Sequence, residues 1–247
     1  VEIAGCPWAM KHRLVRIGLK GREIARDRRP VSNLVFLLDV SGSMCEPHSA
    51  PCTTRPKIAA LKQAAKDLLD IVYGPNDTGE DLYVSVVPFN SRVKIGTSRT
   101  GWLSATAPSG WRGCVEVRSG ANGYNDTPPS GGRWAPTPTS VTYRSGGRNV
   151  TYTVPCNIEL LPLTASKATV KARIDSLVAE GGTRIDNAAG WGWRTLSERW
   201  GGLWGTAGLP LDDDEPPAKA IVIMSDGFNE PFAPLDGSIT TAQADTN

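Results

Sequence analysis

The feature that most constrains the fold of this chain is an apolar run at residues 34–38 that ends in Asp39. Such a run predicts a strand buried on both faces, as in a parallel sheet. Asp39, Ser41 and Ser43 follow on a turn, and Gly42 lets the backbone bend between the serines. Hard cations such as Mg²⁺ prefer oxygen ligands, so the turn is a candidate metal site. Asp and Ser are also ordinary turn formers, and the stretch alone leaves both interpretations open.

Two later segments favour the metal site. Residues 220–224 form another apolar run, which ends in Ser225, Asp226 and Gly227, and residues 180–186 form a glycine-hinged loop that carries Thr183. Loops after parallel strands meet at the carboxyl edge of an open sheet, where ligands bind. The Asp-x-Ser-x-Ser turn, the Gly-Gly-Thr loop and the Ser-Asp-Gly turn resemble the metal-ion-dependent adhesion site of von Willebrand factor A (VWA) domains.

This resemblance implies a set of metal ligands and a kind of partner. The first loop would supply Asp39, Ser41 and Ser43, the second Thr183 and the third Asp226. We expect Mg²⁺, with Mn²⁺ or Ca²⁺ as alternatives, and an acidic residue of a protein partner that completes the coordination. The site would therefore bind a partner and not turn over a substrate.

The remaining patterns predict an α/β fold. Apolar residues at helical spacing predict a helix over residues 56–73, and residues 82–89 a second strand. Residues 90–95 are expected to turn back as an edge strand in a hairpin. We expect Ser166 to cap a helix that ends at residues 181–182, and Asp186 to cap another with Trp193 and Trp200 on its buried face. The order predicts a doubly wound, mainly parallel sheet with helices on both faces.

The domain organisation follows from a change in composition. Residues 97–163 are rich in Gly, Pro, Ser and Thr and lack helical periodicity, so they are expected to form an inserted subdomain with a hairpin near residues 141–154. The resemblance to VWA domains implies that residues 1–30 are a lead-in segment and that residues 31–96 and 164–247 are the two parts of a VWA domain. A VWA fold would continue with two more strands, so we expect an incomplete C-terminus, an open edge at residues 221–224 and strand complementation by another chain.

Cysteine usage favours an oxidising compartment. The chain has five cysteines, no Cys-x-x-Cys pair and two histidines, which argues against a zinc site. We expect a Cys45–Cys52 disulfide in the loop after the metal turn, and a Cys114–Cys156 disulfide that brackets the insertion, with Cys6 unpaired. Free thiols in a cytosolic protein stay open as the alternative.

Charge and hydropathy do not point to a nucleic acid or a membrane. The 27 basic and 25 acidic side chains give a net charge of +2, and the aromatic residues of the insertion are too sparse for nucleic-acid binding. No run of about 18 apolar residues occurs, so no membrane segment is expected in this chain.

Three features resemble the VWA region of tight-adherence (Flp-type) pilus-assembly proteins of the G class. They are the Trp-Gly-Trp-Arg-Thr-Leu-Ser segment at residues 191–197, the cysteine-containing insertion and Pro-Leu-Thr at residues 162–164.

The expected function is a metal-dependent protein-binding module of the bacterial cell envelope, extracellular or periplasmic, in pilus assembly or adhesion. One alternative is a metal-dependent hydrolase or phosphatase, but neither histidine lies in a motif, and a Gly-x-Ser-x-Gly elbow and a P-loop are both absent from the sequence. We therefore do not expect an enzyme. The other alternative is a structural pilus component with a vestigial metal site.

Overall fold

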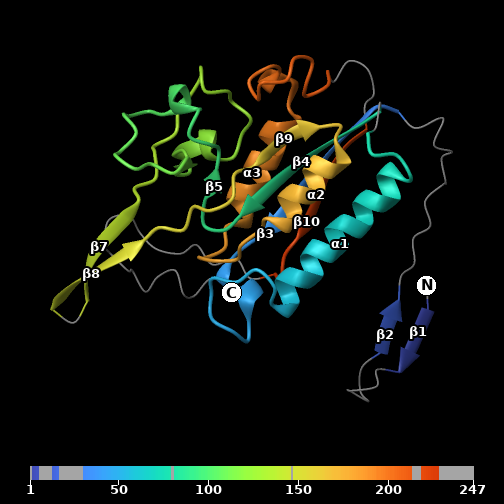
Figure 1. The fold of residues 1–247 in the computed structure, drawn as a ribbon, viewed down its shortest axis with the longest axis horizontal. Coiled ribbons are helices and arrows are strands. Elements are labelled where there is room, and N and C mark those ends of the chain that lie inside the picture. The colour runs from blue at the N-terminus through green and yellow to red at the C-terminus, as the bar shows by residue number, and fades with distance from the viewer. Residues whose placement is uncertain are drawn as a thin grey trace.

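An open four-stranded sheet forms the centre of the protein (Figure 1). The computed structural model describes residues 2–5, 13–16, 30–78, 81–145, 147–212 and 218–227. The strand order is β10, β3, β4, β9, in which β10, β3 and β4 are parallel and β9 is antiparallel. The strands are β3 Ser32–Asp39, β4 Leu82–Phe89, β9 Leu161–Thr164 and β10 Ala218–Met224.

The predicted strand over residues 34–38 is confirmed as β3, which lies inside the sheet between β10 and β4. Phe36 and Leu38 pack against one face, whereas Val35 and Leu37 pack against the other. All four side chains are buried. An uninterrupted apolar run is required here because helices cover both faces of the strand.

Helices α1 Pro56–Tyr73 and α2 Lys167–Asp175 cover one face of the sheet (Figure 1). The predicted limits of α1 are confirmed: proline stands at its first position, and Gly74 follows it with a φ of 62°. The predicted cap of α2 is also confirmed, since Ser166 Oγ accepts a hydrogen bond from Thr169 N at 3.2 Å. However, α2 ends at Asp175 and not at residues 181–182, because the chain straightens to pair Ala179 with Cys52.

Helix α3 Ile185–Leu196 covers the opposite face, and its orientation corrects one prediction. Trp191 is fully buried, whereas Trp193 is 47% exposed. The helix faces the sheet through Gly192, where a Cβ atom would lie 2.8 Å from Leu37 Cδ2. That close approach turns Trp193 outward. Trp200 is buried as predicted, although it lies beyond α3 in the 3₁₀ turn η5 Glu198–Trp200.

The edge of the sheet beside β4 differs from the prediction. Residues 90–95 do not return along β4; instead β5 Val93–Lys94 pairs with β6 Cys114–Val115 in a separate two-stranded sheet. Asn90 Oδ1 accepts a hydrogen bond from Arg92 N at 3.0 Å, which turns the chain away from the sheet. Strand β9 takes the edge position, and it comes from residues assigned to the end of the insertion.

The insertion contains the predicted hairpin and is closed by the predicted disulfide. Strands β7 Ser140–Ser145 and β8 Arg148–Thr153 pair antiparallel. Both expected disulfides, Cys45–Cys52 and Cys114–Cys156, are present, while Cys6 lies outside the described residues. The other short elements are β1 Glu2–Gly5 paired with β2 Arg13–Arg16, and the 3₁₀ turns η2 Gly42–Cys45, η3 Thr100–Trp102 and η4 Gly120–Gly123. Across the described part of the chain, every helix is too short or too polar to cross a membrane.

Candidate functional site

The first loop of the candidate site folds around Asp39, the last residue of β3. Asp39 Oδ1 accepts a hydrogen bond from Ser41 N at 2.8 Å, which holds the tight turn. The chain then enters η2, and the Oγ atoms of Ser41 and Ser43 lie 2.9 Å apart. Asp39 and Ser41 are buried, whereas Ser43 is partly exposed. The turn therefore places a carboxylate and two hydroxyls together, as the spacing predicts.

The third loop joins the first because β10 runs parallel to β3. Met224 is paired with Leu38, so the next residue, Ser225, comes beside Asp39. Ser225 Oγ donates to Asp39 Oδ2 at 2.6 Å. In the same way, Ser43 Oγ donates to Asp226 Oδ1 at 3.2 Å. A chain of hydrogen bonds thus links the two carboxylates of the site.

The second loop approaches the first through its backbone. Gly42 N donates to Gly181 O at 2.7 Å. A Cβ atom on Gly42 would lie 3.1 Å from that carbonyl oxygen, and Gly181 has a φ of +81°, so both positions favour glycine. Thr183 follows in this loop and is buried. Among the described residues, the hydrogen bonds connect four of the five predicted ligands, and the Thr183 hydroxyl is not joined to that network.

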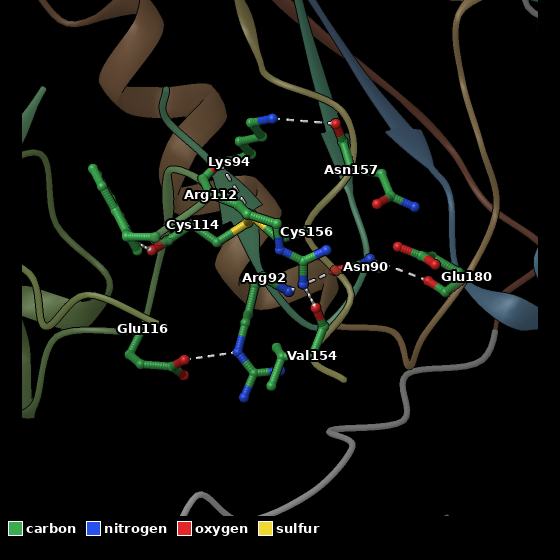
Figure 2. Close-up of a disulfide and its surroundings, with 11 residues drawn as sticks. Asn90, Arg92, Lys94, Arg112, Cys114, Glu116, Val154, Cys156, Asn157 and Glu180 are labelled. Carbon is green, nitrogen blue, oxygen red and sulfur yellow. Dashed lines mark hydrogen bonds and ion pairs between the residues drawn. A yellow bond between two sulfur atoms is a disulfide. The ribbon is translucent and has the colours of Figure 1, made fainter. Parts of the chain in front are cut away.

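Asn90 holds the second loop against the end of β4. Its side-chain Nδ2 donates to Glu180 O at 3.1 Å, and its backbone carbonyl oxygen accepts from Arg184 N at 3.1 Å. Figure 2 shows Asn90 and Glu180 beside the Cys114–Cys156 disulfide. The loop that carries Thr183 is therefore supported at both ends by one residue, through its side chain at one end and its backbone at the other, next to the Cys114–Cys156 cross-link.

The Cys45–Cys52 disulfide supports the second loop from the other side. Cys52 and Ala179 exchange backbone hydrogen bonds, with N···O distances of 3.1 and 2.8 Å. Glu180 N then donates to Val40 O at 2.7 Å. The long path between Ser43 and α1 is thus an ordered segment that braces the site.

The charges of the site are only partly balanced. Burial raises the pKa of Asp39, and the hydrogen bonds from Ser225 and Ser41 offset part of this effect. Within the described part of the chain, no basic side chain forms an ion pair with Asp39. Asp226 differs, because Lys57 Nζ lies 2.9 Å from its Oδ2 atom. Hydrogen bonds to Asp226 and Glu46 raise the pKa of Lys57.

Three residues of this arrangement were not identified as site residues from the sequence. Ser225 was part of the recognised turn, and the parallel register of β10 and β3 would have placed it opposite Asp39. Asn90 carries a turn signal at the end of β4, but its contacts with the second loop are long-range. Lys57 has no distinguishing pattern, because it is one of several lysines on α1.

The donor set suits a hard divalent cation. It consists of carboxylate and hydroxyl oxygens, which such cations prefer as ligands. A positive charge, the Lys57 ammonium, already lies beside one of the carboxylates, Asp226. Groups of three or more His, Cys, Asp or Glu that could hold a metal do not occur within the described ranges. A metal here would therefore depend on the hydroxyls of Ser41, Ser43 and Thr183 in addition to the two carboxylates.

No family model and no curated protein matches the chain. One similar solved structure is the adhesive tip pilin GBS104 of Group B Streptococcus agalactiae, with 16% identity and a TM-score of 0.39. The alignment covers 80% of this chain and 45% of that chain, so this chain spans less than half of the pilin's length. A TM-score of this size does not establish a shared fold.

Proposed function

We propose that this chain is a metal-dependent protein-binding module of the bacterial cell envelope, with a VWA-type site and a role in pilus assembly or adhesion. The observation that carries the proposal is the hydrogen-bonded network of Asp39, Ser41, Ser43 and Asp226 at the carboxyl edge of β3 and β10. The two disulfides fit an oxidising compartment such as the cell envelope.

In this proposal each residue has a defined role. Asp39 and Asp226 supply the negative charge that attracts the cation, while Ser41, Ser43 and Thr183 supply neutral oxygens. Neutral ligands leave much of the charge of the cation uncompensated. When bound, the cation would supply a positive centre that attracts a carboxylate of a protein partner.

Calorimetry with Mg²⁺, Mn²⁺ and Ca²⁺ tests the proposal. Asp39→Ala should weaken metal binding by roughly 10- to 100-fold or more, because this is the loss seen even for residues that only hydrogen-bond to a ligand. Ser41→Ala should weaken binding less, because it removes an oxygen but no charge. Asp67→Ala is the matched control, since it removes an exposed carboxylate from α1. Equal affinity of the wild type and Asp39→Ala for all three ions would refute the site.

A second measurement addresses the partner. Arrays of peptides that differ only in Asp or Glu against Asn or Gln should show acidic sequences bound in Mg²⁺ and released by EDTA. A wild-type protein that binds none of the three ions would support the alternative of a structural pilus component with a vestigial site. Peptide binding that survives EDTA would contradict the role of the metal.

A further inference from the structure

The side chain of Lys57 reaches from the first turn of α1 into the candidate metal site. Its Nζ lies 2.9 Å from Asp226 Oδ2 and 2.9 Å from Glu46 Oε2. Glu46 belongs to the loop closed by the Cys45–Cys52 disulfide, whereas Asp226 is a candidate ligand. The ammonium therefore joins a carboxylate of the site to one outside it.

The two carboxylates around Lys57 differ in exposure. The Asp226 side chain is 12% exposed and that of Glu46 is 64% exposed. Water and salt screen an exposed ion pair more strongly than a sheltered one, so the pair with Asp226 is the stronger. Both oxygens of Asp226 have partners, because Oδ1 accepts from Ser43 and Oδ2 from Lys57. A divalent cation at this carboxylate would be close to the Lys57 ammonium, and the two positive charges would repel each other.

We propose that Lys57 is a built-in competitor of the metal ion, which holds Asp226 until a divalent cation takes this carboxylate from it. The inference rests on the proposed function and describes the regulation of the same site. Glu46 gives the released ammonium a second carboxylate, so that metal binding does not leave Lys57 unpaired.

The consequence is a threshold for filling the site. Displacing the Lys57 ammonium costs the free energy of its ion pair with Asp226, and this cost is subtracted from the free energy of metal binding, because two positive charges at one carboxylate repel each other. The affinity for the ion is therefore lower than the same oxygens would give without Lys57. The site therefore fills, and an acidic partner binds, at higher concentrations of free divalent cation than the same site would need without Lys57.

Calorimetric titration of the full chain with Mg²⁺ tests this role. Lys57→Met removes the charge and should raise the affinity roughly fivefold, the size of a favourable, partly exposed ion pair. Lys57→Arg keeps a competing cation and should stay within about twofold of the wild type. Lys66→Met is the matched control: it removes the same charge, paired with Asp175, about 13 Å further along the helix.

A second readout separates displacement of Lys57 from a general effect of charge. Thermal unfolding without Mg²⁺ should show a lower midpoint for Lys57→Met than for the wild type, because the ion pair with Asp226 is lost. At saturating Mg²⁺ the two midpoints should coincide, because the ion has already broken that pair in the wild type. Equal lowering under both conditions would mean that Lys57 stays on Asp226 and would overturn the inference.

The outcomes also separate this inference from the proposed function. Tight Mg²⁺ binding by the wild type with the same affinity in Lys57→Met would overturn the inference alone. A similar gain in Lys57→Met and Lys66→Met would overturn it too, since charge at a distance would then suffice. Binding by Lys57→Met without binding by the wild type would support it in its strongest form. No Mg²⁺ binding by any variant would overturn both.

Discussion

The two faces of the central sheet are packed by different kinds of side chain. On the α1 and α2 face most core side chains are aliphatic, such as Ile58 and Leu69 of α1 and Ile174 of α2, and Phe36 and Tyr73 are its aromatic members. On the α3 face, five tryptophan rings contact one another: Trp102, Trp134, Trp191, Trp200 and Trp204. The first face is built from periodic helices, and the second from segments far apart in the sequence.

This difference shows that the insertion completes the core of the α3 face. Arg118 lies 4.0 Å from the ring centroid of Trp134, and Arg194 lies 4.9 Å from that of Trp191. Arg194 also donates to Gly123 O at 2.9 Å, which joins α3 to the insertion. Burial lowers the pKa of Arg194 to about 9, so the guanidinium stays charged at neutral pH. The insertion is thus packed against α3 through rings and charged hydrogen bonds.

Trp200→Ala should have the largest effect on stability. Trp200 is fully buried, and its Nε1 donates to Asp126 O at 2.6 Å. The cavity should lower the free energy of unfolding by about 3–5 kcal/mol, as measured by urea denaturation. Trp193→Ala is the matched control, because its side chain is 47% exposed, and should change it by no more than about 0.5 kcal/mol. Similar losses in the two variants would contradict this orientation of α3.

Limited proteolysis of the same variant sharpens the comparison of the two faces. Trp200→Ala should increase cleavage within residues 97–160, because the insertion loses part of the surface against which it packs. Leu69→Ala, which empties a buried position on the α1 and α2 face, should leave those cleavage sites protected under folding conditions. Increased cleavage in both variants would mean that the insertion does not depend on the tryptophan cluster in particular.

The two disulfides provide the next test. Cys114 and Cys156 are 42 residues apart, and Cys45 and Cys52 are 7 apart. Chain entropy alone predicts that replacing each pair with alanine costs about 4 and about 2 kcal/mol, respectively. Urea denaturation of the two double variants would show this difference. A larger loss from the short loop would contradict the entropic account.

Metal binding should rank these two variants in the opposite order. The Cys45–Cys52 loop carries Glu46, which pairs with Lys57, and its Cys52 pairs with Ala179 next to the second loop. Its removal should weaken Mg²⁺ affinity more than removal of the Cys114–Cys156 cross-link does. Calorimetry on both variants would therefore separate support of the site from support of the fold.

The helices and strands that were predicted correctly are those whose limits are marked by residues close to them in the sequence. Strands β3 and β4 are apolar runs with sharp ends, and α1 begins at Pro56 and ends before Gly74. Strand β9 was missed because its residues 161–164 include a proline and follow a Gly- and Pro-rich segment. The face of α3 was misjudged because the residue against the sheet is Gly192, so the apolar pattern drew attention to Trp193.

The candidate site also has residues that the sequence predicts and a contact that it does not. The positions of Asp39, Ser41, Ser43 and Asp226 could be predicted because each lies at or shortly after the end of an apolar strand. The contact of Lys57 with Asp226 could not be predicted, because it joins residues 169 positions apart and depends on how α1 packs against the sheet. Long-range ion pairs leave no periodic signal in a sequence.

Asp39→Asn should have the smallest effect on stability, since Asp39 lies at the end of the strand shared by both faces but belongs to neither core. Burial raises its pKa in the folded protein above the ordinary value of 3.8, so the folded state binds more protons than the unfolded state between these two values. The stability of the metal-free wild type should therefore fall as the pH rises through the folded pKa of Asp39. Asp39→Asn lacks this loss and keeps an acceptor for Ser41 N, so at neutral pH without metal it should be at least as stable as the wild type. Urea denaturation from pH 4 to pH 8, with EDTA, would measure both curves, and a variant that is less stable than the wild type across the whole range would show that the folded protein needs the carboxylate itself.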